Sequence, residues 1–355
     1  MKGKKRHILL TIITIFIILL LSSCKKEDVR QIEDEIIEEA KEEVDEETIV
    51  EEPAKKEGIP SPLSGLYAAE DRVNRRPVAV MYDNHPRARW QAGLSKAEIV
   101  YEFLVEAPYT RYMAIFLIND PESIGPIRSS RPYFVSALLE YDPVYVRVGG
   151  SPEAKRDIKE LKIADIDGLS SSNKVLWKNR EVGKRAPHNT YTSMEVIRKT
   201  QLERGYKESG DYIGFKFNEV DVDLDGFKAE RVEIAYFKNN NTKYIYKPED
   251  KVYYREKDGE RHIDEWDNEP IVAKNIIIQE AKTRVIDKEG RLAIDIVGEG
   301  KGKYITNGKG IDIKWVKKSR NSKTYFYDDS GKEIILNPGV TWIQVVNTDP
   351  DLIIE

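Results

Sequence analysis

Arginine, histidine and asparagine side chains gather in a few short pieces of the sequence, where together they could bind an anion. The longest piece is Asp83-Asn84-His85-Pro86-Arg87-Ala88-Arg89. The others are Thr110-Arg111, Arg128-Ser129-Ser130-Arg131, Gly149-Gly150-Ser151 and Pro187-His188-Asn189. Arginine grips a carboxylate or phosphate with two parallel hydrogen bonds, and histidine titrates near neutral pH. These residue types indicate an anion-binding site or an acid–base site.

All five pieces contribute to the predicted site. The candidate ligand-binding residues are Asn84, Arg87, Arg89, Thr110, Arg111, Arg128, Ser129, Arg131, Gly149, Gly150, Ser151, His188 and Asn189. In a catalytic site, His188 or His85 would act with Asp83 as acid or base. The competing interpretation of each arginine is a salt bridge, and each histidine alone is more often a hydrogen-bonded structural residue. Carboxylates that could pair with the arginines are Asp83, Glu98, Glu102 and Glu106.

The elements that must position these loops are strands interleaved with helices. Buried strands are expected at Pro77–Tyr82, Ile99–Leu104, Tyr112–Ile118 and Val144–Val148, and helices at about 131–140, 152–161 and 193–203. In open α/β sheets, ligands bind outside the carboxyl ends of the strands, where helix N-termini offer N–H groups to anions. We expect Ser129 or Ser130 to cap a helix that Pro132 begins, and Ser151 to begin the next one.

From Phe215 onward the sequence consists of short runs in which apolar and polar residues alternate. Turn signals such as Asp258-Gly259 and Asn307-Gly308 separate these runs. This pattern predicts a meander that forms a curled sheet or a small barrel. The fold class is therefore an α/β (mixed α+β) N-terminal domain over residues 61–217 and a β-rich C-terminal domain over residues 218–355. Because the second stretch has its own strand pattern, we expect it to fold alone.

The N-terminus predicts where the protein resides. A basic start is followed by an apolar run from Ile8 to Leu20 and by Leu21-Ser22-Ser23-Cys24, in which Cys24 is the single cysteine of the 355 residues. Small residues before a cysteine are what bacterial lipoprotein signal peptidase requires, so residues 1–23 are interpreted as a signal peptide and Cys24 as the lipidation site. A transmembrane anchor is the alternative, although the run is shorter than the ~20 residues that span a bilayer.

Residues 24–60 are interpreted as an acidic flexible tether. Between Glu27 and Glu57 there are 15 acidic residues against four basic ones and no aromatic residue, so this segment cannot bury enough surface to offset its ordering entropy. A helical stalk is the alternative, because Ile32, Ile36, Ala40 and Val44 are four residues apart. The remaining chain, residues 60–355, carries 47 basic and 47 acidic residues. That balance argues against a nucleic-acid partner.

Several motifs that could carry chemistry fail on inspection. Ser171-Ser172-Asn173-Lys174 matches Ser-x-x-Lys, but the Lys-Thr-Gly partner of penicillin-recognising enzymes is absent. The glycines from Gly298 to Gly308 have the wrong spacing for a phosphate-binding loop and suit hairpins better. No metal or cofactor is expected. Asp221, Asp223 and Asp225 copy half of a calcium loop, whose twelfth position should be glutamate and here is Val232. A strand entering an Asp-Gly hairpin is the simpler interpretation, and calcium binding at this turn stays open.

As a set, these motifs resemble the YerB-like lipoproteins of Gram-positive bacteria, the DUF3048 family. The resemblance runs from about Leu63 to Val346 and rests on the loop motifs above, Gln91-Ala92-Gly93-Leu94-Ser95, Gly125-Pro126-Ile127 and the ending Asn337-Pro338-Gly339-Val340-Thr341-Trp342. It implies a surface lipoprotein with an α/β domain followed by a β-rich one, and brings no established activity. Two departures are Ala107-Pro108-Tyr109, in place of a glycine-containing turn, and Arg147, in place of a histidine.

Three functions fit these observations. The first is a binding or accessory lipoprotein on the extracellular face of the cell membrane, whose arginine-lined cleft holds a peptidoglycan or teichoic-acid fragment or a carboxylate of a partner protein. The second is a cell-wall enzyme that uses His188 or His85. The third is a scaffold that docks a membrane enzyme. We favour the first, and a shared cleft of Arg89, Arg128, Arg131 and His188 would separate the first two from the third.

Overall fold

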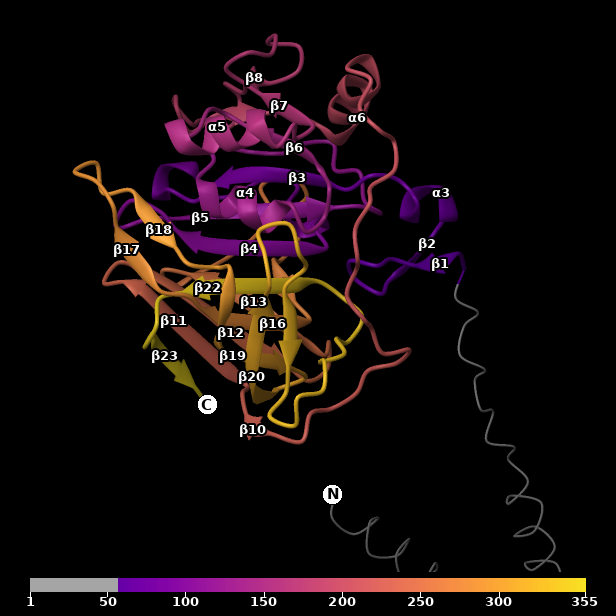
Figure 1. Ribbon diagram of the computed structural model, residues 1–355, viewed down its shortest axis with the longest axis vertical. Coiled ribbons are helices and arrows are strands. Elements are labelled where there is room, and N and C mark those ends of the chain that lie inside the picture. The colour runs from indigo at the N-terminus through magenta and orange to yellow at the C-terminus, as the bar shows by residue number, and fades with distance from the viewer. Residues whose placement is uncertain (1–56) are drawn as a thin grey trace, which may run out of the picture. The chain divides into compact units, whose positions relative to one another are not determined.

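A mixed β-sheet of eleven strands runs through the described part of the chain, residues 57–355, in this computed structural model (Figure 1). Its strands in spatial order are β10 (Phe227–Lys228), β20 (Lys309–Lys317), β19 (Gly298–Thr306), β16 (Asn275–Glu280), β22 (Thr341–Val346), β4 (Ile99–Leu104), β5 (Thr110–Phe116), β3 (Val78–Asp83), β6 (Val144–Arg147) and β7 (Asp165–Asp167), with β21 (Tyr325–Tyr327) paired to β20. We call it the main sheet.

The strand directions of the main sheet decide which loops meet. Pairing is parallel between β16 and β22, β22 and β4, β3 and β6, and β6 and β7, whereas β5 is antiparallel to both of its neighbours. Strands β3, β4, β5 and β22 are buried along their whole length, which explains their nearly continuous apolar sequences. The carboxyl ends of β3, β4, β6 and β22 therefore share one edge with the beginning of β5.

A second, smaller sheet covers part of one face of the main sheet. Its strands in spatial order are β14 (Glu260–Arg261), β13 (Val252–Lys257), β12 (Asn240–Lys247), β11 (Arg231–Phe237) and β23 (Asp351–Ile354), with β15 (Val272–Ala273) paired to β13. Three two-stranded pairs complete the strands: β1 (Ile59–Pro60) with β2 (Tyr67–Ala68), β8 (Trp177–Lys178) with β9 (Thr190–Tyr191), and β17 (Thr283–Val285) with β18 (Leu292–Ile294). Strand β13 alternates between half-buried and buried residues, as expected of a sheet with one covered face.

The helices of residues 57–355 are short. They are α3 (Glu70–Val73), α4 (Pro132–Leu138), α5 (Pro152–Glu160) and α6 (Met194–Glu203), with 3-10 turns η1 (Pro86–Ala88) and η2 (Leu94–Lys96). Helix α5 begins as predicted, because Ser151 accepts a hydrogen bond from the backbone N–H of Ala154 at 3.2 Å. The predicted cap of α4 is wrong. Arg131 is its N-cap residue and makes no side-chain capping bond, because the Ser130 hydroxyl accepts from the Tyr145 hydroxyl instead.

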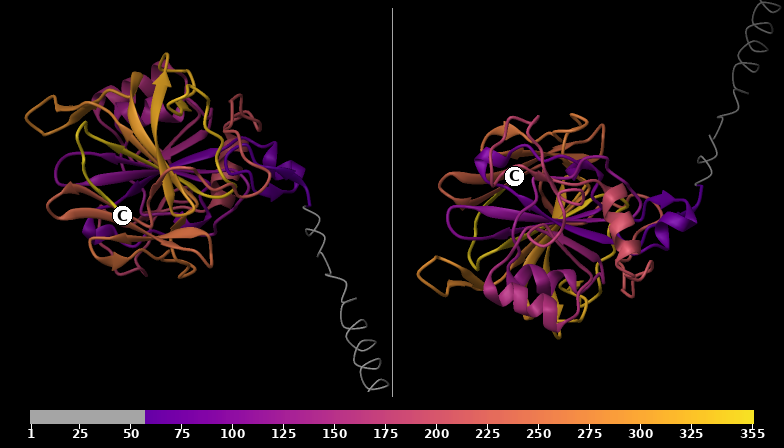
Figure 2. Two further views of the ribbon diagram at one scale, coloured as in Figure 1. Left: turned by 90° about the horizontal axis from the view of Figure 1, so that it is seen from below. Right: turned by 90° about the horizontal axis from the view of Figure 1, so that it is seen from above.

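Two hydrophobic cores lie on the two faces of the main sheet, and both mix the N-terminal and C-terminal regions. On one face α4 and α5 contribute Phe134 and Ile158, which pack with Phe103 and Ile343 of the central strands. The core of the other face contains residues of α6 and the smaller sheet, together with Val100 and Trp342. In Figure 2 the magenta helices α4 and α5 lie on one side of the central strands and the orange strands of the smaller sheet on the other.

The strands and helices predicted for the first region are confirmed, each within two residues of its observed bounds. Of the meander predicted for the second region, β11, β12 and β13 are confirmed as consecutive antiparallel neighbours, but the later strands do not close it into a barrel of its own. Strands β16 and β22 are buried on both faces and insert beside β4, so the two regions share one sheet. The hairpin of β19 and β20 turns at Asn307-Gly308, as predicted, but its strand bounds were not predicted, because glycines interrupt the apolar pattern. At Gly302 a Cβ atom would lie 2.3 Å from the carbonyl oxygen of Ile278 on the neighbouring strand.

The predicted signal peptide, Cys24 and almost all of the predicted tether lie outside the described residues. Among residues 57–355, no helix combines the length and apolar character that crossing a bilayer requires.

Candidate functional site

The main sheet brings the predicted loops to one edge. Asp83 at the end of β3 lies opposite Arg111 at the beginning of β5. The segment that carries Arg128 returns beside β3, because the backbone N–H of Arg128 donates to the carbonyl of Met81 at 2.8 Å. Segments that are far apart in the sequence therefore meet at this edge, as the strand directions predict.

Asp83 is the centre of this edge. Its Oδ2 atom accepts a hydrogen bond from Nδ1 of His188 at 2.8 Å and lies 3.2 Å from Nε of Arg128. The carboxylate side chain is 4% exposed, whereas that of Arg128 is 29% exposed. The second oxygen, Oδ1, accepts from the backbone N–H of His85 at 3.0 Å. One buried carboxylate thus orients a histidine and an arginine that reach the surface. We call Asp83, His85, Arg128 and His188 the histidine cluster.

The two histidines of the cluster are stacked, with ring centroids 4.4 Å apart and an angle of 19° between the rings. On its other side His85 contacts the ring of Tyr109 at 4.6 Å. The backbone N–H of Arg87 donates to Nδ1 of His85, so the neutral ring carries its proton on Nε2. Burial lowers the pKa of His85 below 6.5, and the positive charges of His188, Arg87 and Arg128 lower it further against the opposing effect of Asp83.

A second group of cations lies behind the histidine cluster. Nε of Arg131 donates to Glu106 at 2.6 Å, and Nη2 of Arg111 is 3.7 Å from the same carboxylate. Arg111 also donates to the carbonyl of Ser129 at 3.1 Å. Burial lowers the pKa of Arg111 to about 10, and the nearby charge of Arg131 acts in the same direction. Two arginines therefore share a single carboxylate, which leaves an excess of positive charge beside Asp83.

Lys178 adds to this positive charge and was missed by the sequence analysis. Its Nζ donates to the hydroxyl of Thr190. Lys178 lies on β8, which pairs with β9, and β9 begins directly after His188 and Asn189. Burial and then the charge of Arg128 lower its pKa. No local sequence signal marks Lys178, since only strand pairing places it there. Asn189 is buried, and its Oδ1 atom has no hydrogen-bond partner among the described residues.

Three predicted residues belong instead to a buried network that joins the two regions. Arg89 lies outside the histidine cluster. It pairs with Asp258, and its Nε donates to Asn84 at 3.2 Å. Asn84 donates to Thr110 at 2.7 Å, and Thr110 donates to Glu102 at 2.7 Å. The four residues that were expected to share one cleft therefore fall into two groups. Arg128 and His188 contact Asp83, whereas Arg89 and Arg131 pair with other carboxylates.

Glu102 is the hub of this network and is fully buried with both of its cationic partners. Arg255 Nη2 lies 2.6 Å and Lys257 Nζ 3.2 Å from its oxygens, and all three side chains are 0% exposed. Burial alone would raise the pKa of Glu102, but Lys257 and Arg255 outweigh it and hold the pKa at about 2. The network continues through Arg255 to His262, which lies 2.9 Å from Gln91. This cluster holds the smaller sheet against the main sheet.

The glycine loop after β6 is already satisfied internally. Gly149 has a φ of +70°, in the left-handed region that favours glycine, and its N–H donates to Asp167 at 2.8 Å. Arg147, which stands in place of the histidine of the resembling family, grips Asp165 with two hydrogen bonds of 2.7 and 2.8 Å. The backbone N–H groups of Gly149 and Ser151 are therefore used within the protein, and the anion contact predicted for this loop stays a prediction.

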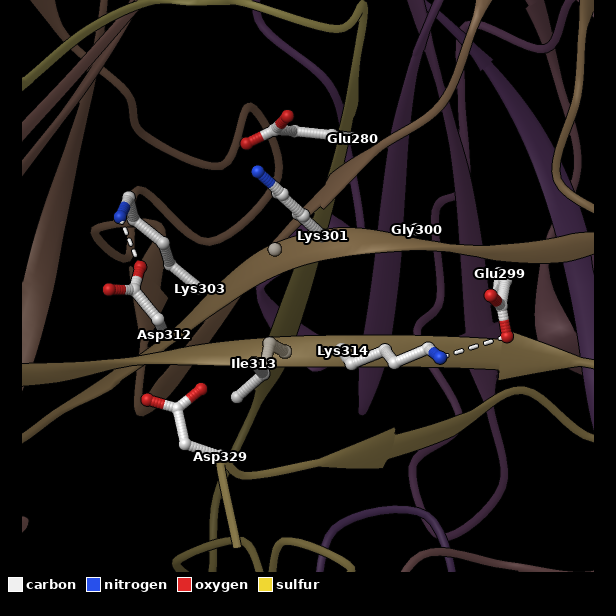
Figure 3. A pocket seen from close by; sticks show the side chains of 10 residues that line it. Glu280, Glu299, Gly300, Lys301, Lys303, Asp312, Ile313, Lys314 and Asp329 are labelled. Atoms are coloured by element: carbon white, nitrogen blue, oxygen red, sulfur yellow. Dashed lines mark hydrogen bonds and ion pairs between the residues drawn. The ribbon is translucent and has the colours of Figure 1, made fainter. Parts of the chain in front are cut away.

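The glycine-rich segment and the Asp221–Asp225 turn do not belong to the histidine cluster. The hollow of about 630 Å³ beside β19 and β20 is lined by Gly300 and Gly302, and two of its lysines pair with acids, Lys303 with Asp312 and Lys314 with Glu299 (Figure 3). Asp221 accepts from Lys274 at 2.6 Å and Asp223 from Asn307 at 2.9 Å. The predicted strand over 220–224 is absent from the described structure. Among the described residues, no three His, Cys, Asp or Glu side chains gather closely enough to hold a metal ion.

Fold and site together define a class: a mixed α+β protein in which two regions share a sheet and one sheet edge carries histidines and arginines. Residues 63–207 match the family described as "Protein of unknown function (DUF3048) N-terminal domain", and residues 232–343 match the corresponding C-terminal domain. The chain belongs to this family, and the predicted family resemblance is confirmed.

Relatives from Bacillus subtilis support the assignment. "Putative lipoprotein YerB" of strain 168 is 37% identical over 297 residues, which are 83% of this chain and 87% of that protein. The crystal structure of the YerB protein from the same species has a TM-score of 0.74 and 35% identity, and the match covers 81% of this chain and 96% of that one. The predicted fold class of a mixed domain followed by a β-rich one is confirmed.

Proposed function

We propose that this protein is a lipid-anchored binding lipoprotein of the cell surface whose histidine cluster holds an anionic group of the cell envelope. The observation that carries the proposal is the shared carboxylate: Asp83 orients both His188 and Arg128, while the charges of Arg111, Arg131 and Lys178 exceed the carboxylates beside them. An anion at this edge would meet arginine donors and partly exposed imidazoles. A peptidoglycan or teichoic-acid fragment supplies such a group.

Anchoring is the first part of the proposal to test. Cys24 is the only thiol in the chain, so a lipid on this residue is the only thioether attachment available. Cys24→Ala is expected to release the protein from the membrane fraction or to leave an uncleaved precursor. Cells fed a fatty-acid analogue should label the wild type and not the variant, and an unlabelled wild-type protein would contradict the assignment.

Arg128→Ala tests the binding site. We expect the affinity for muropeptides or teichoic-acid fragments to fall ten- to a hundred-fold, because a hydrogen bond to a charged group contributes about 1.5–3 kcal/mol. Stability should change by less than about 1 kcal/mol, since Arg128 is partly exposed and Asp83 keeps its bonds to His188 and to the backbone of His85. Calorimetry measures the affinity, and thermal melting measures the stability.

Arg284→Ala is the matched control, because Arg284 forms an exposed ion pair with Asp295 at 2.8 Å and is not part of the histidine cluster. It should bind as the wild type does. A large fall in melting temperature for Arg128→Ala, with no ligand found for the wild type, would overturn the binding proposal and favour the scaffold.

An enzyme is the second candidate, and the Asp83–His188 hydrogen bond favours it. A carboxylate that accepts from Nδ1 leaves Nε2 of the ring as a base, and Nε2 of His188 makes no hydrogen bond to a described residue. His188→Ala distinguishes the candidates. Loss of affinity supports binding, whereas retained affinity with loss of turnover of a cell-wall substrate supports catalysis.

A further inference from the structure

A second feature, at the opposite edge of the main sheet, is not used by the proposed function. Two adjoining hollows of about 380 and 470 Å³ share the lining residues Asp120, Pro121 and Glu122, which follow the carboxyl end of β5. The histidine cluster lies at the beginning of β5, so the whole length of this strand separates the two sites. Hollows of a few hundred cubic ångströms are in the range that holds small ligands. We call this pair of hollows the tryptophan groove.

Trp266 stands at one end of the groove and is 56% exposed. Its loop is held firmly from both sides. Asp264 accepts from the backbone N–H groups of Trp266 and Gly93 at 2.9 and 3.0 Å, and Asp267 pairs with Lys96 at 2.7 Å. The indole N–H makes no hydrogen bond to a described residue. A large aromatic ring displayed on a fixed loop, with its donor unused, is built for contact with a ligand.

Arg198 of α6 stands at the other end of the groove. Its Nη1 is fixed by the carbonyl of Arg76 and by Gln201 at 3.2 Å, whereas Nε and Nη2 are buried without a partner among the described residues. This pair of N–H groups forms a fork that can donate two parallel hydrogen bonds to a carboxylate. Burial lowers the pKa of Arg198 to about 10, and the neighbouring Arg75 contributes in the same direction.

The charges between the two ends largely cancel. Lys96 pairs with Asp267, and Arg75 pairs with Asp120 at 2.8 Å. What remains without a partner among the described residues is an aromatic face, an indole N–H, a guanidinium fork and the exposed carboxylates of Glu122 and Glu195. A sugar ring offers an apolar face of C–H groups for the indole and hydroxyls for Glu122, and an acidic substituent would accept from the fork.

We propose that the tryptophan groove binds an oligosaccharide that carries a carboxylate, with a sugar ring stacked on Trp266 and the carboxylate at Arg198. The site is separate from the histidine cluster and does not depend on it. The groove thereby gives the protein a contact with glycan chains in addition to the anion at the opposite edge.

The test uses the full chain in detergent and two disaccharides. N-acetylglucosaminyl-N-acetylmuramic acid carries a carboxylate, and N,N′-diacetylchitobiose is its neutral counterpart. The wild type should bind the acidic sugar more tightly by calorimetry. Trp266→Ala should lower the affinity for both sugars at least ten-fold. Leu202→Ala removes another exposed apolar side chain (58% exposed) and should leave both affinities unchanged. Arg198→Lys should reduce the affinity for the acidic sugar to that for the neutral one.

Arg128→Ala separates this inference from the proposed function, because it should leave binding of the neutral N,N′-diacetylchitobiose, which has no anion for the histidine cluster, unchanged. Wild-type affinity in Trp266→Ala overturns the groove, as does failure of the wild type to bind either sugar at millimolar concentration. Loss of sugar binding in Arg128→Ala together with retention in Trp266→Ala would assign the sugar to the histidine cluster instead. If Arg198→Lys does not fold, Trp266→Ala alone decides the question.

Discussion

Replacing Glu102 by glutamine is expected to lower the free energy of unfolding by about 3–5 kcal/mol. The substitution keeps the volume but leaves Arg255 and Lys257 buried without a counter-charge. Arg255 cannot lose its proton. Burial already lowers the pKa of Lys257 to about 8 against the opposing charge of Glu102, so Lys257 can lose its proton, but that relieves only its own part of the unpaired charge. The measurement is the urea midpoint and slope of wild type and variant.

Glu256→Gln provides the matched control. Glu256 lies on β13 beside these cations, but its partner Lys243 is 3.4 Å away, and both side chains are about a quarter exposed. This substitution should cost less than about 1 kcal/mol. A loss for Glu102→Gln no larger than that of the control would show that the buried cluster does not hold the smaller sheet in place.

Separating the two regions is expected to abolish cooperative folding, contrary to the expectation from sequence. Residues 218–355 alone would expose the edge of β22 that pairs with β4 and the apolar contacts of Trp342 and Tyr244. We expect this fragment to show no sharp thermal transition and to aggregate. Mixing it with residues 57–217 should restore a transition, because both cores need side chains from each region.

The measurement is differential scanning calorimetry of each fragment and of their equimolar mixture, with the intact chain as reference. A sharp transition for residues 218–355 alone, with strand content equal to its share of the intact protein, would show that this region is an independent domain after all.

The sequence predicted elements better than their assembly. Periodicity located β4 and α5 closely because their apolar patterns are local. It could not show that β22 pairs with β4, since both are buried on two faces and such a strand can join any sheet that covers it. The turn of the β19–β20 hairpin could be predicted from Asn307-Gly308, but its strand bounds could not, because Gly300 and Gly302 leave room for neighbours instead of contributing side chains.

The same limit applies to the candidate site. Loops at strand ends could be predicted to converge, and the approach of Asp83, Arg128 and His188 follows from strand direction. Arg89 could not be separated from them, because its partner Asp258 is 169 residues away in the chain. Trp266 gave no sequence signal, since exposure of a tryptophan depends on the fold around it.

The central claim, that the histidine cluster holds an anion, is tested most directly by NMR of the imidazole rings. After Cys24 the chain has three histidines, and buried His262, whose pKa lies well below 6.5 because of burial and Arg255, serves as an internal control. In the free protein, His85 should gain its proton only below pH 6.5, since burial and the neighbouring cations lower its pKa. A bound anion favours the charged ring, so it should raise this pKa, and by linkage its affinity should increase as the pH falls through that range.

The measurement is the pH titration of the His85 and His188 resonances with and without a saturating teichoic-acid or muropeptide fragment. The account predicts that the ligand raises the pKa of His85 and shifts the resonances of His188, leaves His262 unmoved, and has no such effect in Arg128→Ala. Identical titration curves for His85 and His188 with and without a fragment that calorimetry shows to be bound would contradict it.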